Sequence, residues 1–143
     1  MIAVDTNILV HAQRRDSRWH VPATRTIESL ASGREVWAVP WPCIHEFYAI
    51  ATHPRIYAPP STPAQALAQL RAWRESPTLS LLAEDDAYWP VLESLIERSR
   101  LTGPAIHDAR IAALCLRHGT HALLTADRDF SRYPELNTQN PLI

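Results

Sequence analysis

Short apolar segments alternate with helical segments along most of the chain, and this alternation is the feature that most constrains its fold. Four segments have the apolar composition and the length of buried strands: Ile2–Val4, "EVWAVP" (35–40), "TLSLLA" (78–83) and "HALLT" (121–125). Helical patterns of about ten to fifteen residues separate them. This order predicts an α/β domain with a parallel sheet, because a parallel connection needs a crossover such as a helix.

The helical segments are recognised by apolar residues at helical spacing, and several begin at a proline, which the first turn of a helix tolerates. The segment "PAIHDARIAALCLRH" is apolar on nearly every side, so we expect a central, buried helix there. A short turn or helix is expected through Phe130, followed by a weak last strand near Leu142. The expected helices are Asn7–Arg14, Pro22–Ser32, Pro42–Thr52, Pro63–Trp73, Asp86–Arg98 and Pro104–His118.

The size and composition of the chain predict one globular domain over residues 1–143. Apolar residues make up 46% and charged residues 20%, which is typical of a folded protein that buries a substantial core. No apolar run approaches the roughly 20 residues that cross a bilayer, and no signal peptide is evident. We therefore expect a cytoplasmic protein without membrane contact, in which Cys43 and Cys115 are buried, reduced thiols.

The basic residues exclude two classes of protein. All 14 of them are arginine, and the chain contains no lysine. Aspartyl-phosphate phosphatases and receiver-type signalling modules both place an aspartate after the first strand, but both rely on a lysine. The phosphatases also need a second aspartate two residues later, where this chain has Asn7. The formal net charge of −1 shows no global basic signature, so any contact with nucleic acid depends on local patches.

Four acidic residues interrupt otherwise apolar segments. Asp5 ends the first strand, Asp127 follows "HALLT", Glu46 lies within the helix at 42–52, and Asp108 lies near the start of the helix at 104–118. In parallel sheets, ligands bind beyond the carboxyl ends of the strands, where these acids are expected to meet. Taken alone, Asp5 is equally well explained as a helix cap, and Asp108 gains from the helix dipole.

A shared metal ion explains the four acids together. Desolvating an unpaired carboxylate is costly, and four such groups in one small domain indicate a common counter-ion. Oxygen ligands without a cysteine set favour Mg²⁺ or Mn²⁺. Such a centre suits hydrolysis of a phosphodiester, which needs neither a lysine nor a covalent nucleophile. His45 and His107 adjoin two of the acids, but adjacent helical residues point about 100° apart, so we do not expect them to bind the same metal.

The ordered set of motifs resembles the PIN-domain ribonucleases, and most closely the VapC toxins of type II toxin–antitoxin modules. It consists of "VDTNILV", a glutamate in the third helix, "HDARIAAL" and "LLTADRDF", and the likeness spans Ile2 to about Pro141. The resemblance implies a three-layer fold with a central parallel five-stranded sheet flanked by helices. It also implies cleavage of RNA, a homodimer and inhibition by a cognate VapB antitoxin.

The resemblance assigns roles to individual residues. Asp5, Glu46, Asp108 and Asp127 match the acidic quartet that holds Mg²⁺ or Mn²⁺. Either acid of the "DRD" triplet can face the metal in this family, so Asp129 is an alternative to the favoured Asp127. Two polar residues match supporting positions, Asn7 beside the first aspartate and Thr125 in the last motif.

Two arginine clusters are candidates for gripping RNA. Arginine binds phosphate in a bidentate manner, and a tryptophan can stack on an unpaired base. An ordinary solvated loop explains the clusters equally well. The remaining tryptophans are expected in the core or an interface, and "HPRIYAPPSTP" is expected to be a loop in preference to a docking site for a partner. The candidate RNA contacts are Arg14, Arg15, Arg18, Trp19, Arg128 and Arg132.

The sequence thus predicts a toxin-type, metal-dependent endoribonuclease. The alternative is a catalytically inactive PIN-like module that only binds RNA or a partner. The intact acidic set argues against this alternative.

Overall fold

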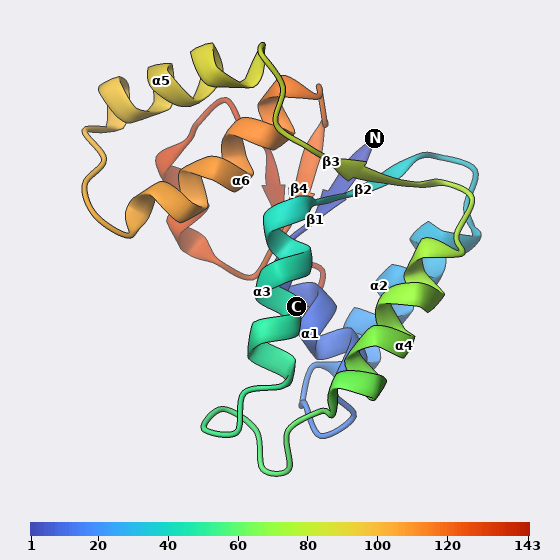
Figure 1. Ribbon diagram of the computed structural model, residues 1–143. Helices are drawn as coiled ribbons and strands as arrows, with labels where there is room; N and C mark the ends of the chain where they lie inside the picture. The colour runs from blue at the N-terminus through green and yellow to red at the C-terminus, as the bar shows by residue number, and fades with distance from the viewer.

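Five strands form one parallel sheet, in the order β3–β2–β1–β4–β5, in the computed structural model, which describes all residues 1–143 (Figure 1). β1 (Ile2–Val4) is central and pairs with β2 (Trp37–Pro40) on one side and β4 (Ala122–Leu124) on the other. β3 (Leu79–Leu82) and β5 (Thr138–Gln139) form the two edges. The predicted parallel five-stranded sheet is confirmed.

Helices cover both faces of this sheet, as the predicted three-layer fold requires (Figure 1). α5 and α6 pack against each other on one side, α1 and α2 pack together on the other, and α3 contacts both α1 and α6. The helices are α1 (Thr6–Gln13), α2 (His20–Ser32), α3 (Trp41–Ala51), α4 (Pro63–Arg74), α5 (Tyr88–Ser99), α6 (Ala105–Arg117) and the short 3₁₀ helix η1 (Arg128–Arg132).

The last strand differs from the expectation. It lies at Thr138–Gln139, where it pairs with Leu123 and Leu124 of β4, and not near Leu142. Leu142 is buried against the core within a turn. The apolar signal at the end of the chain therefore came from a buried loop residue, while the strand itself is exposed and polar.

The core lies between the sheet and the helices and holds the strand ends in place. The cluster of 31 buried residues includes most of β1, β2 and β4, together with six residues of α6 from Ala109 to Cys115. The expectation of a central, buried helix at α6 is confirmed, as is that of two buried, unpaired cysteines. Among the helices, none has the length and apolar character needed to cross a membrane.

Parallel pairing brings three strand ends to one edge of the sheet. Asp5 follows β1 directly, α3 begins at Trp41 directly after β2, and Thr125 follows β4. Gly119, whose φ of +70° suits a residue without Cβ, reverses the chain between α6 and β4, so that β4 runs parallel to β1. The carboxyl edge of the sheet is therefore where the acidic segments meet.

Candidate active site

Asp5 is a buried carboxylate at the end of the central strand. Only 4% of its surface is exposed. Its Oδ1 accepts a hydrogen bond from the Thr6 backbone N–H at 2.7 Å, so Asp5 caps α1, and the Cys43 thiol donates to the same oxygen at 3.6 Å. Burial raises the pKa of Asp5 to about 6, against the opposing effect of hydrogen bonds from Thr125 and Thr6. Asp5 is thus a helix cap that also lies at the acidic edge, so the two explanations that the sequence left open for it are compatible.

Asn7 and Thr125 connect Asp5 to the last motif. The Thr125 hydroxyl donates to Asp5 Oδ2 at 2.7 Å, and the Asn7 amide donates to the same oxygen and to Thr125 Oγ1, both at 3.3 Å. Asn7 Oδ1 accepts from the Ala126 N–H at 3.2 Å, and Thr125 Oγ1 accepts from the Asp127 N–H at 3.0 Å. These bonds fix the loop that carries Asp127 against the start of α1.

Glu46 is linked to the same network through Thr6. The Thr6 hydroxyl, which is buried, donates to Glu46 Oε2 at 2.8 Å and so joins the first turn of α1 to α3. Cys43 lies one turn before Glu46 on α3, and its thiol contacts the Asp5 carboxylate. The acids of β1 and α3 therefore share one set of positioning contacts.

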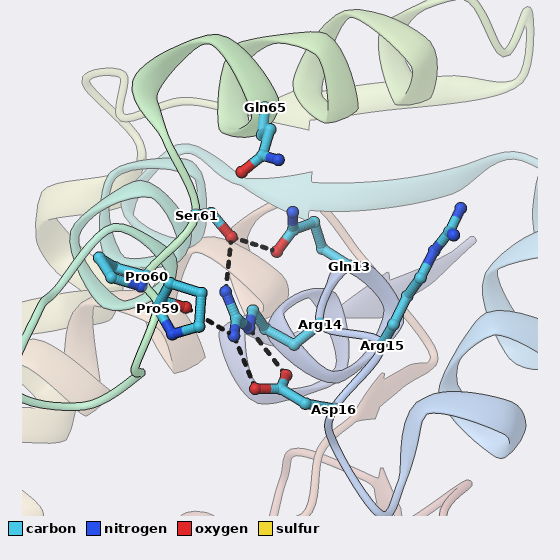
Figure 2. Close-up of a pocket in the computed structure, with 8 residues that line it drawn as sticks. All are labelled: Gln13, Arg14, Arg15, Asp16, Pro59, Pro60, Ser61 and Gln65. Carbon is cyan, nitrogen blue, oxygen red and sulfur yellow. Dashed lines mark hydrogen bonds and ion pairs between the residues drawn. The ribbon is translucent and has the colours of Figure 1, made fainter.

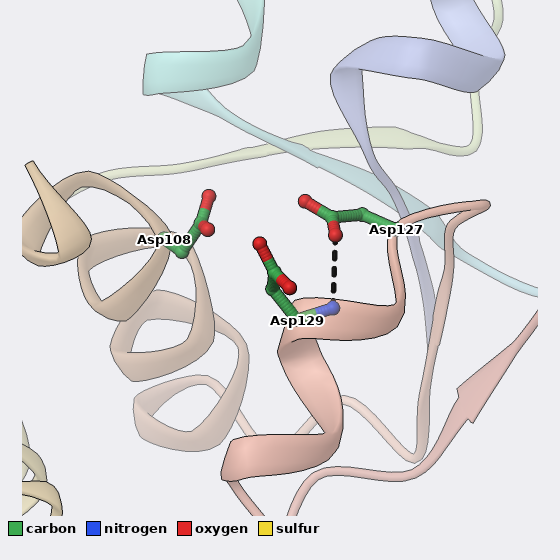
Figure 3. A group of neighbouring side chains, drawn as sticks. All are labelled: Asp108, Asp127 and Asp129. Atoms are coloured by element: carbon green, nitrogen blue, oxygen red, sulfur yellow. Dashed lines mark hydrogen bonds between the residues drawn. The ribbon is translucent and has the colours of Figure 1, made fainter.

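Asp108, Asp127 and Asp129, here called the acidic trio, form the tightest group of carboxylates. Each offers an oxygen that lies within 4.8 Å of those of the other two. Figure 3 shows Asp108 on α6 facing the two acids of η1 and its preceding loop, with the Asp129 N–H donating to Asp127 Oδ1 at 2.9 Å. The structure brings both acids of the "DRD" triplet to Asp108, whereas Asp5 and Glu46 lie outside the trio.

The charges of these acids are left uncompensated by the chain. The pKa of Asp108 is raised by burial first and then by the charges of Asp127, Asp129 and Glu46, while Arg132 acts weakly in the opposite direction. Neither the acidic trio nor Asp5 and Glu46 form a salt bridge with an arginine or a histidine. A group of oxygen donors without a cation of its own fits a hard divalent ion. His45 and His107 are exposed and do not belong to the trio.

Three residues of this region were not singled out from the sequence. Thr6 stands inside "DTN" at the first position of α1, and its role depends on Glu46, which lies 40 positions away in the sequence. Cys43 precedes Glu46 by three residues, so both lie on one face of α3, which the helical period alone could indicate. Tyr133 lines a pocket next to the trio, and no sequence pattern pointed to it.

The arginines near the last motif lie beside the acids. Arg128 and Arg132 are exposed on η1, and Arg132 lines the pocket that Asp108 and Asp129 also line. The N-terminal cluster lies elsewhere. It follows the far end of α1, whose eight residues span roughly 12 Å from the acidic edge. The N-terminal cluster is therefore separated from the acidic edge by the length of α1, whereas Arg128 and Arg132 lie beside it.

Arg14 binds the protein's own loop. Its guanidinium donates to both oxygens of Asp16, at 2.9 and 2.6 Å, to the Ser61 hydroxyl at 3.1 Å and to the Pro59 carbonyl at 2.9 Å. Figure 2 shows these contacts at a polar hollow of about 590 Å³. The guanidinium also lies over the Tyr57 ring, at 4.3 Å from its centroid. Four of its five N–H groups are used, so we leave Arg14 out of the RNA surface proposed below.

The rest of the N-terminal cluster is more open. Arg15 and Arg18 are exposed, and Trp19 packs partly against the core with Arg18 at 4.6 Å over its ring. Among the other tryptophans, Trp37 and Trp73 are buried as expected, whereas Trp41 and Trp89 are 36% and 55% exposed. The segment "HPRIYAPPSTP" is an irregular loop up to the start of α4, as expected.

Fold and site together define an α/β protein with an acidic centre at the carboxyl edge of a parallel sheet. The family model for the PIN domain matches residues 2–136. Ribonuclease VapC43 of Mycobacterium tuberculosis is 30% identical to this chain over 142 residues, which cover 99% of this chain and 96% of that protein. Ribonuclease VapC48 of the same organism is 26% identical over 96% of this chain and 94% of that protein. This chain belongs to the PIN-domain family and, within it, to the VapC group.

Solved structures share the fold. VapBC2 from Rickettsia felis, bound to a DNA fragment from its promoter, superposes with a TM-score of 0.70 at 20% identity and covers 98% of both chains. VapC20 of Mycobacterium tuberculosis, described as a toxin that cleaves the sarcin–ricin loop, gives a TM-score of 0.65 at 20% identity over 92% of this chain and 93% of that one. These likenesses confirm the three-layer α/β architecture.

Proposed function

We propose that this chain is a toxin-type endoribonuclease that hydrolyses RNA phosphodiester bonds with Mg²⁺ or Mn²⁺. The observation that carries the proposal is the acidic trio, whose carboxylates crowd together at the carboxyl edge without a cation from the chain. The names of its VapC relatives, all ribonucleases, supply the class of substrate. We treat residues 1–143 as one PIN domain, because one continuous core underlies the site.

In this proposal, Asp108, Asp127 and Asp129 hold the metal ion, and Asp5 and Glu46 complete the charge around it. The chemistry that such an ion supplies when bound is acidification of a water molecule and neutralisation of charge on the phosphate. Glu46 Oε2 is held by Thr6, which leaves Oε1 free to accept the proton of the attacking water. Asn7 and Thr125 hold Asp5, and through it the edge of the sheet, in a fixed geometry.

Single-stranded RNA is the form of substrate that an open site of this kind accommodates best. Arg128 and Arg132 lie next to the acids and are proposed as its first basic contacts. Arg15, Arg18 and Trp19 lie between α1 and α2 and are proposed as contacts to a longer strand.

We further propose a VapB-like antitoxin as protein partner, in the cytoplasm where RNA substrates occur. Several solved structures of the same fold are described as VapBC or toxin–antitoxin complexes, among them one from Klebsiella pneumoniae. We also propose a homodimer, for which the exposed Trp41 and Trp89 offer apolar surface. The molar mass in solution, measured by light scattering, tests this part separately.

Cleavage of RNA with and without metal tests the proposed reaction. Purified protein is incubated with total cellular RNA in Mg²⁺, in Mn²⁺ and in EDTA, and the cleaved ends are mapped by sequencing. We expect cleavage only with metal, and none by the Asp5→Ala variant. Asp86→Ala, which removes an exposed acid outside the site, should cleave like the wild type. Metal-independent cleavage that Asp5→Ala leaves unchanged would overturn the proposal.

A metal titration separates the enzyme from an inactive PIN-like module. The inactive module, which we do not favour, should bind Mn²⁺ weakly and equally in the wild type and in Asp108→Asn. The proposed enzyme should bind Mn²⁺ in calorimetry and lose this binding in the variant.

A further inference from the structure

A pocket of about 300 Å³ adjoins the acidic trio and contains both kinds of charge. Asp108 and Asp129 form its acidic side and Arg132 its basic side, and Tyr133, Pro104 and Ala105 complete the lining. The trio accounts for the two acids. It does not account for the basic side, where an arginine and a tyrosine follow each other in the sequence.

Tyr133, which lines this pocket, carries a buried hydroxyl. The residue is only 2% exposed, and its hydroxyl is the one buried side-chain oxygen or nitrogen in the structure that has no hydrogen-bond partner. Its charged neighbours are Arg132 and Asp108, which both line the pocket. A buried hydroxyl without a partner is unfavourable for the folded chain, so it calls for an explanation in terms of function.

Arg132 lies next to this hydroxyl and has no acid of the chain as an ion-pair partner. The residue is exposed. Arg14, in contrast, uses most of its donors within the protein. The pocket therefore presents several N–H donors and one O–H donor, and its only acceptors of high charge are the two acids assigned to the metal.

We infer that this pocket binds a phosphate of the RNA strand next to the bond that is cleaved, with Arg132 and the Tyr133 hydroxyl donating to its oxygens. The inference rests on the proposed function and adds a subsite to it. Phosphate oxygens only accept hydrogen bonds, and a guanidinium matches two of them at once. A strand whose scissile phosphate lies at the trio carries another phosphate beside it, so the ligand follows from the connectivity of RNA. The buried Tyr133 ring leaves no aromatic face for a base.

The test measures RNA binding without cleavage. Binding of a mixed-sequence, single-stranded RNA 12-mer to the Glu46→Gln protein is followed by fluorescence anisotropy over a range of NaCl concentrations. Adding Arg132→Gln should weaken binding roughly 10-fold or more and lower the slope of log K against log salt by about 0.7, the loss of one phosphate contact. Adding Tyr133→Phe should weaken binding roughly 3- to 10-fold without changing that slope.

Thermal unfolding of the same proteins distinguishes a ligand contact from a structural role. Tyr133→Phe should leave Tm unchanged or raise it, because the lost hydroxyl has no partner in the folded chain. Arg71→Gln on α4 and Tyr88→Phe on α5 remove an exposed arginine and a mostly buried tyrosine elsewhere. Both should keep the affinity and the salt dependence of the parent protein.

Unchanged RNA affinity in the Arg132 and Tyr133 variants would overturn the inference. The same holds if these variants weaken binding of a protein partner but leave RNA affinity unchanged. So would a fall in Tm that accounts for the loss of binding, or a parent protein that does not bind RNA at all. Failure of the proposed function leaves a different result. RNA binding would then depend on both residues as described, while the wild type would not cleave RNA in any metal.

Discussion

The acidic trio and the hollow around Arg14 treat charge in opposite ways. In the hollow, Arg14 and Asp16 neutralise each other, and the arginine also binds a carbonyl and a hydroxyl of the loop after α3 (Figure 2). In the trio, three carboxylates lie within 4.8 Å of one another and no arginine pairs with them (Figure 3). The first arrangement is complete without a ligand, whereas the second leaves the repulsion among three carboxylates without a counter-ion from the chain.

This difference separates residues that hold the fold together from residues that bind. A charged group whose partners all belong to the chain contributes to stability, and its loss is measured in unfolding. A group whose partners are missing costs stability, and its loss is measured in binding or catalysis. Substitutions in the two regions should therefore differ in whether they change stability or binding and catalysis.

The largest effect is expected from Asp108→Asn. Loss of a metal-binding carboxylate should lower the rate of RNA cleavage about 100-fold or more, equivalent to about 3 kcal/mol of transition-state stabilisation. Without metal, the variant should be more stable than the wild type, because the neutral side chain relieves repulsion from Asp127 and Asp129. Cleavage kinetics and urea unfolding in EDTA measure both. A variant that is slower and also less stable would contradict the comparison.

Metal binding should stabilise the wild type by a comparable amount. A concentration of Mn²⁺ about 100 times the dissociation constant adds about 2.7 kcal/mol, which corresponds to roughly 5–10 °C in Tm for a domain of this size. EDTA should remove the gain. Asp127→Asn should show little of it, while Asp16→Asn, in the other region, should retain it. Equal Mn²⁺ gains in both variants would place the ion elsewhere.

Stability without metal should fall as the pH rises from about 4 to 6. Burial raises the pKa of Asp5 to about 6 from 3.8, so in this window the folded chain binds a proton that the unfolded chain has released. The free energy of unfolding should drop by up to about 3 kcal/mol across it. Urea unfolding in EDTA at several pH values measures this, and Asp5→Asn should flatten the profile. A stability that rises with pH only in the wild type would contradict the assignment.

The smallest effect concerns the region that is complete by itself. Arg14→Gln should lower the free energy of unfolding by about 1–2 kcal/mol, since the bonds to Ser61 and Pro59 are lost while the pair with Asp16 is weakened by solvent. The cleavage rate of the folded fraction should stay unchanged. Arg71→Gln, which removes an exposed arginine of α4, is the matched control and should alter neither quantity. A loss of RNA affinity in Arg14→Gln at unchanged stability would reverse the roles assigned here.

The sequence predicted the elements well because their signals are local. Apolar runs placed β1, β2, β3 and β4, and parallel pairing then placed Asp5 and Asp127 at one edge without further information. β5 was misplaced because two exposed, polar residues carry no strand signal, while Leu142 is apolar for another reason. Helix ends were predicted to within about two residues, because the signals that end a helix are weaker than the apolar spacing along it.

The details of the site depend on contacts between distant segments, which no local signal encodes. Thr6 bonds to Glu46 across 40 positions, and Arg14 bonds to Ser61 across 47. The first contact adds a positioning residue that the sequence did not indicate. The second removes Arg14 from the predicted RNA surface. That both Asp127 and Asp129 face Asp108 was equally out of reach, because it depends on how η1 turns after its first residue.

The network that begins with Asp5 also sets the order in which the protein can become active. The Asp5 N–H donates to the Leu124 carbonyl at 3.0 Å, and the Asp5 carboxylate accepts from the Thr125 hydroxyl. The first motif of the sequence is therefore held in place by residues of the last motif. A chain emerging from the ribosome has no assembled centre until the segment through Asp129 has been synthesised and β4 has paired with β1. For a nuclease proposed to be toxic, this dependence means that a nascent chain cannot cleave RNA before its last motif has been synthesised.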